Sequence, residues 1–457
     1  MRRGARLARL AAAVAVVLAL GVLAVGYVHR PPSSSGTAPA QNGKSPPAHV
    51  PQSPVLAPEP SGDLLPTPAG LARVLAGPVH DARLGGRVGY SVVDAITGRR
   101  LAGRDQARPA TPASVTKLVT AAAVLTRPGP AARIITRVVA GAAPGDVVLV
   151  GAGDPTLSVD ARQTYAGGGR LDLLAAAVRR AARTPIRRLV LDGSAYRGPA
   201  TATGWDTGLV SSGDVAPITS LMVNGGRLDP VRRARSAAPD LAAGRALARL
   251  LGVPASAVLQ GRAPAKAREL ARVASQPMAT LVEQMLTISD NVLAEALARQ
   301  VAISRHTPAS FTGAVAAVGA TLTETGTSTA GLHLFDGSGL SRRDLLPAGL
   351  LTTLLVMAAG DRHPQLRPLL TGLPVAGFTG TLDTRFRTGP ARPGAGEVRA
   401  KTGTLSGVSA LAGVALDADG RLLAFAVLAD RVPAGGTPGA ETALDVVAAT
   451  LSRCGCR

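Results

Sequence analysis

Residues 112–127 read PASVTKLVTAAAVLTR, and this segment carries the pattern that decides the fold of the chain. Apolar side chains recur along it at the spacing of one helical face: Val115, Leu118, Val119, Ala122 and Leu125. Ser114 and Lys117 are three residues apart, which places the hydroxyl and the amine on one face of the predicted helix. A desolvated lysine can activate a serine hydroxyl as its base. The segment therefore predicts the nucleophile Ser114 and the base Lys117, unless Ser114 only caps the helix and Lys117 is solvated.

Two further motifs follow in the chain. The triplet Ser289-Asp290-Asn291 begins a segment with helical periodicity, NVLAEALARQVA, where each of its three residues could also serve as a helix cap. Residues 401–404, KTGT, end the strand-like run EVRA, where they could also form an exposed strand end that turns on glycine. Each motif is weak alone. In this order, S-x-x-K, S-D-N and K-T-G are the signature of penicillin-binding proteins and serine β-lactamases.

The resemblance extends past these motifs, over nearly everything from about residue 70 to 450. The chain resembles the class C low-molecular-mass penicillin-binding proteins, the D-alanyl-D-alanine carboxypeptidase/endopeptidase family. The resemblance rests on the segments PASVTKLVTAAAVL (112–125), GAGDPTL (151–157), VAPITSLMVN (215–224), SDNVLAEALARQVA (289–302), DGSGLSRRDLL (336–346), LPVAGFTGTLDTRF (373–386) and VRAKTGTLSGVSALAG (398–413). It implies a serine-type D-Ala-D-Ala carboxypeptidase that acts on peptidoglycan stem peptides and is acylated by β-lactam antibiotics.

The resemblance also implies roles for the catalytic residues. Ser114 attacks the carbonyl of the penultimate D-Ala and forms an acyl-enzyme, and Lys117 takes the serine proton. Ser289 passes a proton toward the leaving amine in concert with Lys401. Removal of a terminal D-Ala and cleavage of cross-links both pass through this acyl-enzyme, so the balance between them stays open.

The substrate-binding residues implied in the same way are Asn291, Lys401, Thr402, Gly403 and Thr404. Asn291 would hold the substrate amide. Lys401, Thr402 and Thr404 would present a cation and hydroxyls to the terminal carboxylate. The backbone N–H groups of Ser114 and Thr404 would form the oxyanion hole.

The order of patterns along the chain predicts a divided domain. We expect an α/β transpeptidase-like domain, with an antiparallel sheet flanked by helices, formed by residues 64–134 and 266–457. Two strands around a turn at Thr97-Gly98 begin it, and strands end it. Residues 135–265 are expected to form one inserted smaller domain. Only 174 residues separate Ser114 from Ser289, too few for the two nested inserts of some family members.

The N-terminal region predicts export. Four arginines in the first nine residues precede an uncharged apolar run of 19 residues, 10–28, long enough to span a bilayer with its N-terminus in the cytoplasm. We expect residues 1–30 to be a membrane anchor or a cleaved signal peptide. Residues 31–63, rich in proline and serine, are expected to be an extended linker. The enzyme would then act at the outer face of the cytoplasmic membrane or in the cell wall.

Composition limits the remaining functions. The net charge of +21 would suit nucleic acid, but the arginines are scattered and only ten aromatic residues are available for stacking on bases. A basic surface that faces anionic lipid or wall polymer explains the charge better. Only four of the 50 basic residues are lysines, and two of these, Lys117 and Lys401, lie in the motifs. The six histidines lack metal-site spacing, so we expect neither a metal nor a cofactor.

Several alternatives stay open at this stage. A serine β-lactamase would share the motifs, but no compact loop with a deacylating carboxylate lies between the first two of them. A wall-binding scaffold could keep the fold without activity.

Trp205 matches a family pattern, and Asp206 either binds the amino group of the stem peptide or lies in a surface turn. For Cys454 and Cys456 three alternatives stay open: they lie in a tail that has no role, they form a local disulfide, or they are a reactive pair of thiols.

Overall fold

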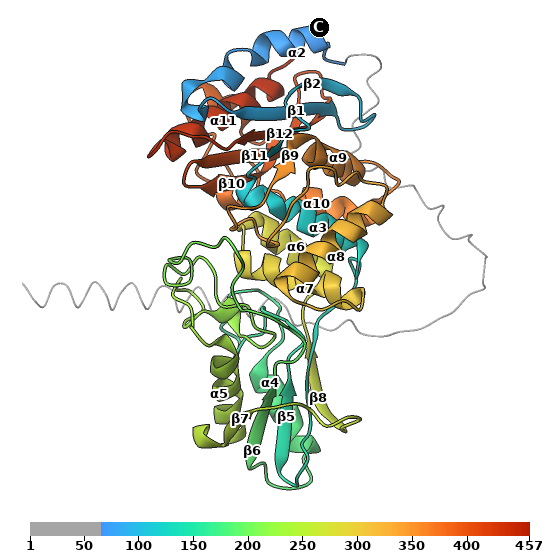
Figure 1. Cartoon of the computed structure of the whole chain (residues 1–457), viewed down its shortest axis with the longest axis vertical. Coiled ribbons are helices and arrows are strands. Elements are labelled where there is room, and N and C mark those ends of the chain that lie inside the picture. Colours follow the sequence, from blue (N-terminus) through green and yellow to red (C-terminus); the bar gives the residue numbers. More distant parts are fainter. Residues whose placement is uncertain (1–64) are drawn as a thin grey trace, which may run out of the picture. The chain divides into compact units, whose positions relative to one another are not determined.

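A five-stranded antiparallel sheet lies at the centre of the expected transpeptidase-like domain in the computed structural model, which describes residues 65–457 (Figure 1). Its strands are β1 (Val88–Asp94), β2 (Arg100–Arg104), β10 (Val398–Leu405), β11 (Val408–Leu416) and β12 (Leu422–Ala429), in the order β10-β11-β12-β1-β2. The predicted hairpin with its turn at Thr97-Gly98 is therefore present as β1 and β2. The predicted anchor or signal peptide (1–30) and linker (31–63) lie outside the described residues.

Alternation along the strands divides their side chains between two cores. In β11 and β12, Ala410, Ala412 and Leu428 belong to one buried cluster, whereas Leu411 and Phe425 belong to another. Successive side chains of a strand point to opposite faces of the sheet, so both faces of this sheet are covered. That is why both strands are buried almost throughout and read as continuous apolar runs.

Helices cover the two faces of the sheet. Helices α2 (Pro68–Leu75) and α11 (Thr437–Ser452) contribute to the second cluster, and the larger group contributes to the first. That group comprises α3 (Thr116–Thr126), α6 (Met278–Thr287), α7 (Asn291–Ser304), α8 (Phe311–Glu324), α9 (Ala348–Ala359) and α10 (Arg367–Thr371). This arrangement confirms the predicted α/β fold with an antiparallel sheet flanked by helices.

Short elements complete the described chain. Strands β3 (Pro109–Ala110) and β9 (Leu346–Pro347) pair with each other. The 3-10 helices are η1 (Pro78–His80), η2 (Ala82–Leu84), η3 (Ala113–Val115), η4 (Asn224–Gly226), η5 (Ala255–Ala257), η6 (Pro364–Leu366), η7 (Gly380–Leu382) and η8 (Gly389–Gly394). Within residues 65–457, no helix is both long and apolar enough to cross a membrane.

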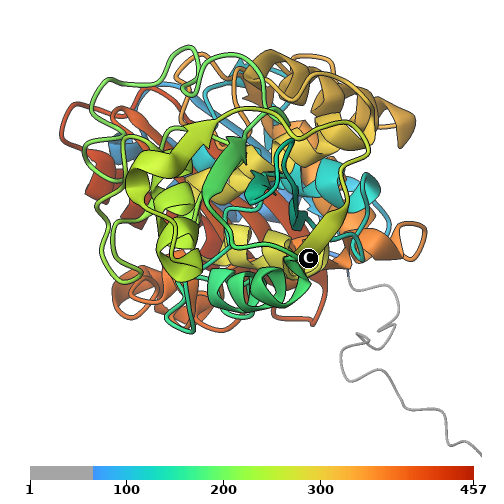
Figure 2. The ribbon, with the colours of Figure 1, turned by 90° about the horizontal axis from the view of Figure 1, so that it is seen from below.

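The insert between α3 and α6 contains a second five-stranded sheet, seen from below in Figure 2 together with α4 (Leu171–Ala181) and α5 (Pro239–Leu251). Its strands are β4 (Ile135–Ala140), β5 (Asp146–Val150), β6 (Arg188–Asp192), β7 (Val258–Gln260) and β8 (Glu269–Ala274), in the order β7-β6-β5-β4-β8. Strand β8 pairs with β4, so this sheet extends past the predicted insert end at residue 265. As an edge strand, β8 is only partly buried and lacks a clear apolar alternation.

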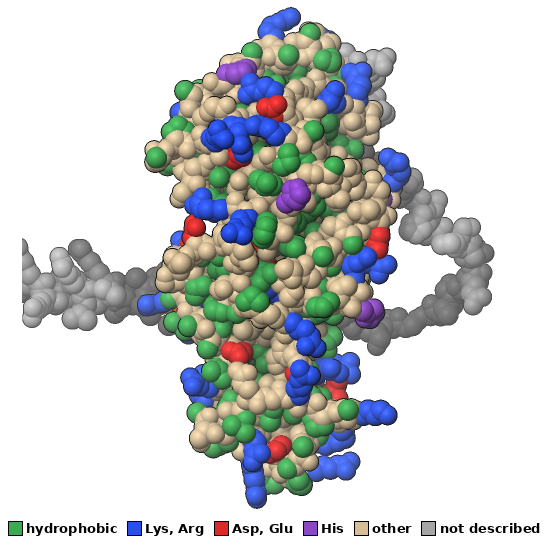
Figure 3. All heavy atoms as spheres, viewed as in Figure 1, with side chains coloured by type: hydrophobic (Ala, Val, Ile, Leu, Met, Phe, Trp, Pro, Cys, Tyr) green, Lys and Arg blue, Asp and Glu red, His purple; other side chains and the backbone are tan. Residues whose placement is uncertain are grey.

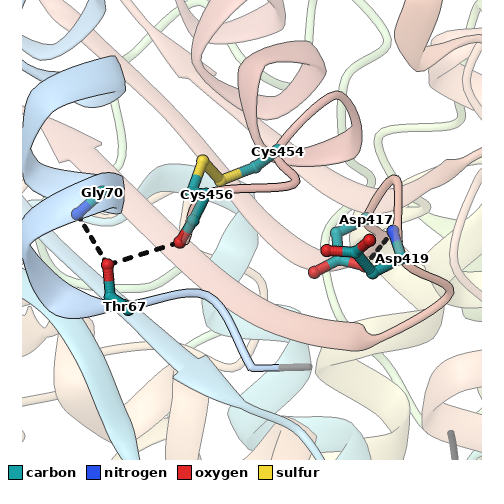
Figure 4. Close-up of a disulfide and its surroundings, with 6 residues drawn as sticks. All are labelled: Thr67, Gly70, Asp417, Asp419, Cys454 and Cys456. Carbon is teal, nitrogen blue, oxygen red and sulfur yellow. Dashed lines mark hydrogen bonds between the residues drawn. A yellow bond between two sulfur atoms is a disulfide. The ribbon is translucent and has the colours of Figure 1, made fainter. Parts of the chain in front are cut away.

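The C-terminal tail packs against the start of the described chain (Figure 4). Cys454 and Cys456 are joined in a disulfide, which is one of the alternatives that the sequence left open. The Thr67 N–H donates to the Cys456 carbonyl at 2.7 Å. The Thr67 hydroxyl also caps α2, because it accepts from the Gly70 N–H at 3.0 Å. The tail and α2 therefore hold each other in place.

A substitution of Gly70 tests how closely the C-terminal tail packs against α2. A Cβ at Gly70 would lie 2.6 Å from the carbonyl oxygen of the half-buried Cys456, so we expect Gly70→Ala to lower the free energy of unfolding by about 1–3 kcal/mol. Gly77→Ala is the matched control, because Gly77 has helical backbone angles and its added Cβ would meet nothing within 4 Å. That variant should be neutral or gain up to about 1 kcal/mol. Urea unfolding of both proteins measures the difference, and equal stability would show that the tail moves freely.

Candidate active site

The turn that carries Ser114 precedes helix α3. Ser114 is the middle residue of η3, and the residue before it, Ala113, has a φ of +51°, a left-handed conformation that non-glycine residues rarely adopt. Such strain is maintained only where the surroundings determine the backbone closely, and it gathers at functional sites. The turn presents the half-buried Ser114 above the first residues of α3, where Lys117 follows.

Lys117 is fully buried, and its amine has three neighbours. Lys117 Nζ lies 2.9 Å from Ser114 Oγ, 2.7 Å from Asn291 Oδ1 and 2.8 Å from the Ser338 carbonyl oxygen. Burial lowers the pKa of Lys117 to about 8, although the negative charges of Asp336, Asp290 and Glu295 raise it in part. A minor part of this amine is therefore neutral near physiological pH, far more than for an ordinary lysine, and a proton acceptor needs this neutral form.

The S-D-N triplet lies at the start of α7. Asp290 is the N-cap, and its carboxylate accepts from the Leu293 N–H at 2.9 Å. It also accepts from the Tyr165 hydroxyl at 2.8 Å. Burial raises the pKa of Asp290, but the charges of Arg235 and Arg227 and its hydrogen bonds outweigh burial, so the pKa lies below its usual value. The cap fixes the first turn of α7, and with it the position of Asn291.

Ser289 lies at the site without a direct link to the other predicted catalytic residues. Its backbone is in the left-handed region, with a φ of +56°, and its side chain is half-buried. Within the described part of the chain, the Ser289 hydroxyl forms no hydrogen bond with Ser114, Lys117 or Lys401. The structure thus brings Ser114, Lys117 and Asn291 into direct contact, with Ser289 two residues before Asn291.

The K-T-G motif lies on β10, beside the Ser114 turn. A Cβ at Gly403 would lie 2.7 Å from the Pro112 carbonyl oxygen and 3.2 Å from the Ser114 nitrogen, so only glycine allows this approach. Lys401 is fully buried and donates to the Thr402 carbonyl at 3.0 Å. Burial, together with the positive charges of Lys117 and Arg385, holds the pKa of Lys401 well below its usual value.

The two threonines of this motif point to different neighbours. The Thr402 hydroxyl donates to Thr381 Oγ1 at 2.9 Å, next to the buried Lys401. The Thr404 side chain is exposed and donates to Glu441 Oε1 at 2.7 Å. Both hydroxyls are therefore already oriented by partners from outside β10.

Sequence reasoning assigned no role to Ser338, whose carbonyl contacts the Lys117 amine. The only signal was the stretch DGSGLSRRDLL (336–346), which belongs to the family resemblance. Asp206, which was a candidate for reading a stem-peptide amine, pairs with Arg342 at 3.1 Å. Arg342 also donates to the Ser406 carbonyl at 2.9 Å, in the turn that follows β10. Any amine that binds Asp206 must therefore compete with this guanidinium.

A serine hydroxyl beside a buried lysine of lowered pKa, with a second buried lysine and a strand edge close by, is the arrangement that a serine hydrolase working by acyl transfer requires. The model of the D-Ala-D-Ala carboxypeptidase 3 (S13) family matches residues 71–236 and 229–451. The chain belongs to this family and is a serine-type D-Ala-D-Ala carboxypeptidase, which confirms the resemblance found in its motifs.

Individual relatives agree with the family. A carboxypeptidase of Mycobacterium tuberculosis is 44% identical over 86% of this chain and 85% of its own length. A D-alanyl-D-alanine carboxypeptidase of Actinomadura sp. is 29% identical over 77% of this chain and 79% of its own. Penicillin binding protein 4 of Haemophilus influenzae shares the fold, with a TM-score of 0.69 at 22% identity over 82% of this chain and 97% of that chain. A second structure of that protein holds a β-lactam, with a TM-score of 0.62 at 21% identity over 84% of this chain and 100% of that chain.

The approach of β10 to the Ser114 turn can be tested at Gly403. We expect Gly403→Ala to reduce D-Ala-D-Ala carboxypeptidase activity by roughly a hundredfold, because the added Cβ forces the strand away from Ser114. Gly319→Ala is the control: Gly319 lies within α8, and its added Cβ would meet nothing within 4 Å. It should keep full activity. A Gly403→Ala enzyme with unchanged kcat/KM would contradict the close approach.

Proposed function

We propose that this carboxypeptidase removes the terminal D-Ala of peptidoglycan stem peptides through an acyl-enzyme at Ser114. The observation that carries the proposal is the distance of 2.9 Å between Ser114 Oγ and the buried Lys117 amine. Lys117 Nζ takes the hydroxyl proton while Ser114 Oγ bonds to the carbonyl carbon of the penultimate D-Ala. The C–N bond then breaks, and the departing amine leaves with a proton. Water hydrolyses the ester and restores Ser114.

The remaining motif residues divide the other tasks. Ser289, two residues before Asn291, relays a proton toward the leaving amine together with Lys401. The Ser114 and Thr404 N–H groups receive the negative charge that develops on the carbonyl oxygen. Lys401, Thr402 and Thr404 bind the free carboxylate of the terminal D-Ala, and Gly403 leaves room for the peptide against β10. A carboxylate of the substrate beside the buried Lys401 amine would favour the charged form of that amine.

Peptidoglycan and β-lactams are the proposed ligands. The Haemophilus influenzae protein of the same fold has been solved with a β-lactam, which supports acylation of Ser114 by these compounds. A β-lactam carbonyl presents the same target to the serine as the peptide carbonyl.

The place of action is proposed to be the outer face of the cytoplasmic membrane or the cell wall, with the apolar run 10–28 as an anchor or an export signal. Figure 3 shows Lys and Arg side chains spread over the visible face rather than gathered in one stripe. A dispersed basic surface suits contact with anionic lipid or wall polymer more than recognition of nucleic acid.

Labelling with a fluorescent penicillin tests the nucleophile. The full-length chain should form a stable adduct that peptide mapping by mass spectrometry places on Ser114. Ser114→Ala should form no adduct and should lose hydrolysis of a D-Ala-D-Ala peptide, with an unchanged thermal unfolding curve. Retained turnover in Ser114→Ala would refute the assignment. Rapid destruction of penicillin by the unmutated enzyme would indicate a β-lactamase, and an inert protein would indicate a scaffold.

The pKa of Lys117 predicts the pH dependence of acylation. Lys117 accepts the serine proton only when its amine is neutral, so the rate should be low at acidic pH and rise to a plateau with a midpoint near pH 8. Stopped-flow measurement of penicillin acylation between about pH 6 and pH 10 gives this profile. Lys266→Gln, at an exposed lysine outside the site, should leave it unchanged. A rate that falls with rising pH would exclude Lys117 as the base.

A further inference from the structure

The hydrogen-bond partners of Lys117 determine where its lone pair points. A neutral lysine amine has two N–H donors and one lone pair. The Ser338 carbonyl oxygen and Asn291 Oδ1 can only accept hydrogen bonds, at 2.8 and 2.7 Å. When both oxygens accept an N–H of the amine, its lone pair points toward Ser114 Oγ. There the lone pair can accept the hydroxyl proton. Whatever fixes these two acceptors therefore also aims the base.

The insert fixes the first acceptor. Asn291 Nδ2 donates to the backbone carbonyl of Asp214 at 3.0 Å, which turns the Oδ1 atom of the amide toward Lys117. Asp214 is itself held in a turn, because the N–H groups of Asp214 and Val215 both donate to the Leu209 carbonyl, at 3.0 and 3.2 Å. Without the Asp214 carbonyl, the Asn291 side chain could rotate and present its NH₂ group to Lys117, which would displace the amine.

The insert also reaches the second acceptor, through Asp336. The Ser338 N–H donates to Glu295 Oε1 at 2.9 Å and to Asp336 Oδ1 at 3.1 Å, so two buried carboxylates hold the peptide next to the Ser338 carbonyl. The other oxygen of Asp336 accepts from the indole N–H of Trp205 at 2.7 Å. Trp205 belongs to the insert, and its ring packs edge-on against Phe311 of α8, with ring centroids 5.4 Å apart.

A small apolar core holds both links together. It joins residues of the insert, among them Val215 and Met222, to Val292 of α7, Phe311 of α8 and Leu340 of the loop that carries Ser338. Val292 follows Asn291 directly, and Leu340 lies two residues after Ser338. The same packing therefore seats the insert beside both acceptors of Lys117.

We propose that residues 202–222 of the insert, which we call the clamp segment, position the catalytic base by holding both acceptors of Lys117. This inference rests on the proposed roles of Ser114 and Lys117. The clamp segment acts on the proton transfer from Ser114 Oγ to Lys117 Nζ and forms no bond with the substrate. Trp205 of the clamp segment and Asp336, which accepts its indole N–H, are the positioning residues.

Trp205→Phe is the direct test, because it removes the indole N–H and keeps an aromatic ring against Phe311. In the full-length chain, the acylation rate constant for penicillin at plateau pH should fall by roughly tenfold to a hundredfold. The dissociation constant of penicillin before acylation should stay within about twofold of the unmutated value. An unchanged rate constant, with or without weaker penicillin binding, would overturn the proposal and leave Trp205 as a ligand contact or a packing residue.

Tyr196→Phe is the matched control for this variant. Tyr196 also belongs to the insert, and its hydroxyl reaches the Ala296 carbonyl of α7 at 3.5 Å without contacting either acceptor of Lys117. This variant should keep the acylation rate constant of the unmutated enzyme. An equal loss in Tyr196→Phe would show that general loosening of the insert, rather than the clamp segment, slows acylation.

Asp336→Asn extends the test should Trp205→Phe fold poorly. The asparagine NH₂ cannot accept from the indole, and the lost negative charge should shift the midpoint of the acylation profile to lower pH, since Asp336 raises the pKa of Lys117. The charged groups that raise the pKa of that amine, and so set the midpoint together with burial, are Asp336, Asp290 and Glu295.

The double variant Trp205→Phe/Asp336→Asn separates the clamp from other effects. If Trp205 acts through Asp336, adding Trp205→Phe to Asp336→Asn should change the acylation rate constant by less than about twofold. Independent, multiplying effects would overturn the proposed link. Failure of the proposed function would appear differently, as the absence of a Ser114 adduct in the unmutated enzyme.

Discussion

The burial of the Lys117 amine is the constraint on which the rest of the site depends. An amine without contact with water must find hydrogen-bond partners in the protein, since an unpaired buried polar group is costly. Three parts of the chain supply them: the serine turn, the start of α7 and the loop at Ser338. Burial also lowers the pKa of the amine. The same burial therefore requires the three hydrogen-bond partners and suits Lys117 to act as a base.

Close backbone packing brings these parts together, and two glycines allow it. A Cβ at Gly339 would lie 1.9 Å from the Ala113 carbonyl oxygen, and one at Gly403 would lie 2.7 Å from the Pro112 carbonyl oxygen. The Ser338 loop and β10 thus both pack closely against the serine turn. Their contact leaves little room for relaxation, which is consistent with the left-handed backbone of Ala113.

Sequence patterns predicted the side chains of the site better than its backbone. Ser114, Lys117 and Asn291 carry recognisable chemistry at recognisable spacing. The apolar periods around them predicted α3 and α7, and the strand-like run before the K-T-G motif predicted β10. Ser338 was missed because it contributes a carbonyl oxygen, which every residue has, so its identity holds no signal. The extent of the insert was missed at β8 because pairing with β4 depends on a partner more than a hundred residues away. The assigned catalytic roles of these residues stay predictions.

The helix-cap interpretation of the S-D-N triplet is compatible with its functional interpretation. Asp290 does cap α7, as the plainer interpretation held, and the cap is what sets Asn291 as the first helical residue, facing Lys117. The insert also contacts the residues around Lys117. It leaves the helical region after Ile134 and returns at Ser275, and these two residues are hydrogen-bonded to each other at 2.9 Å. The two ends of the insert are therefore joined at one point. The contacts at Asp290, Asn291 and Asp336 are then where the insert bears on catalysis.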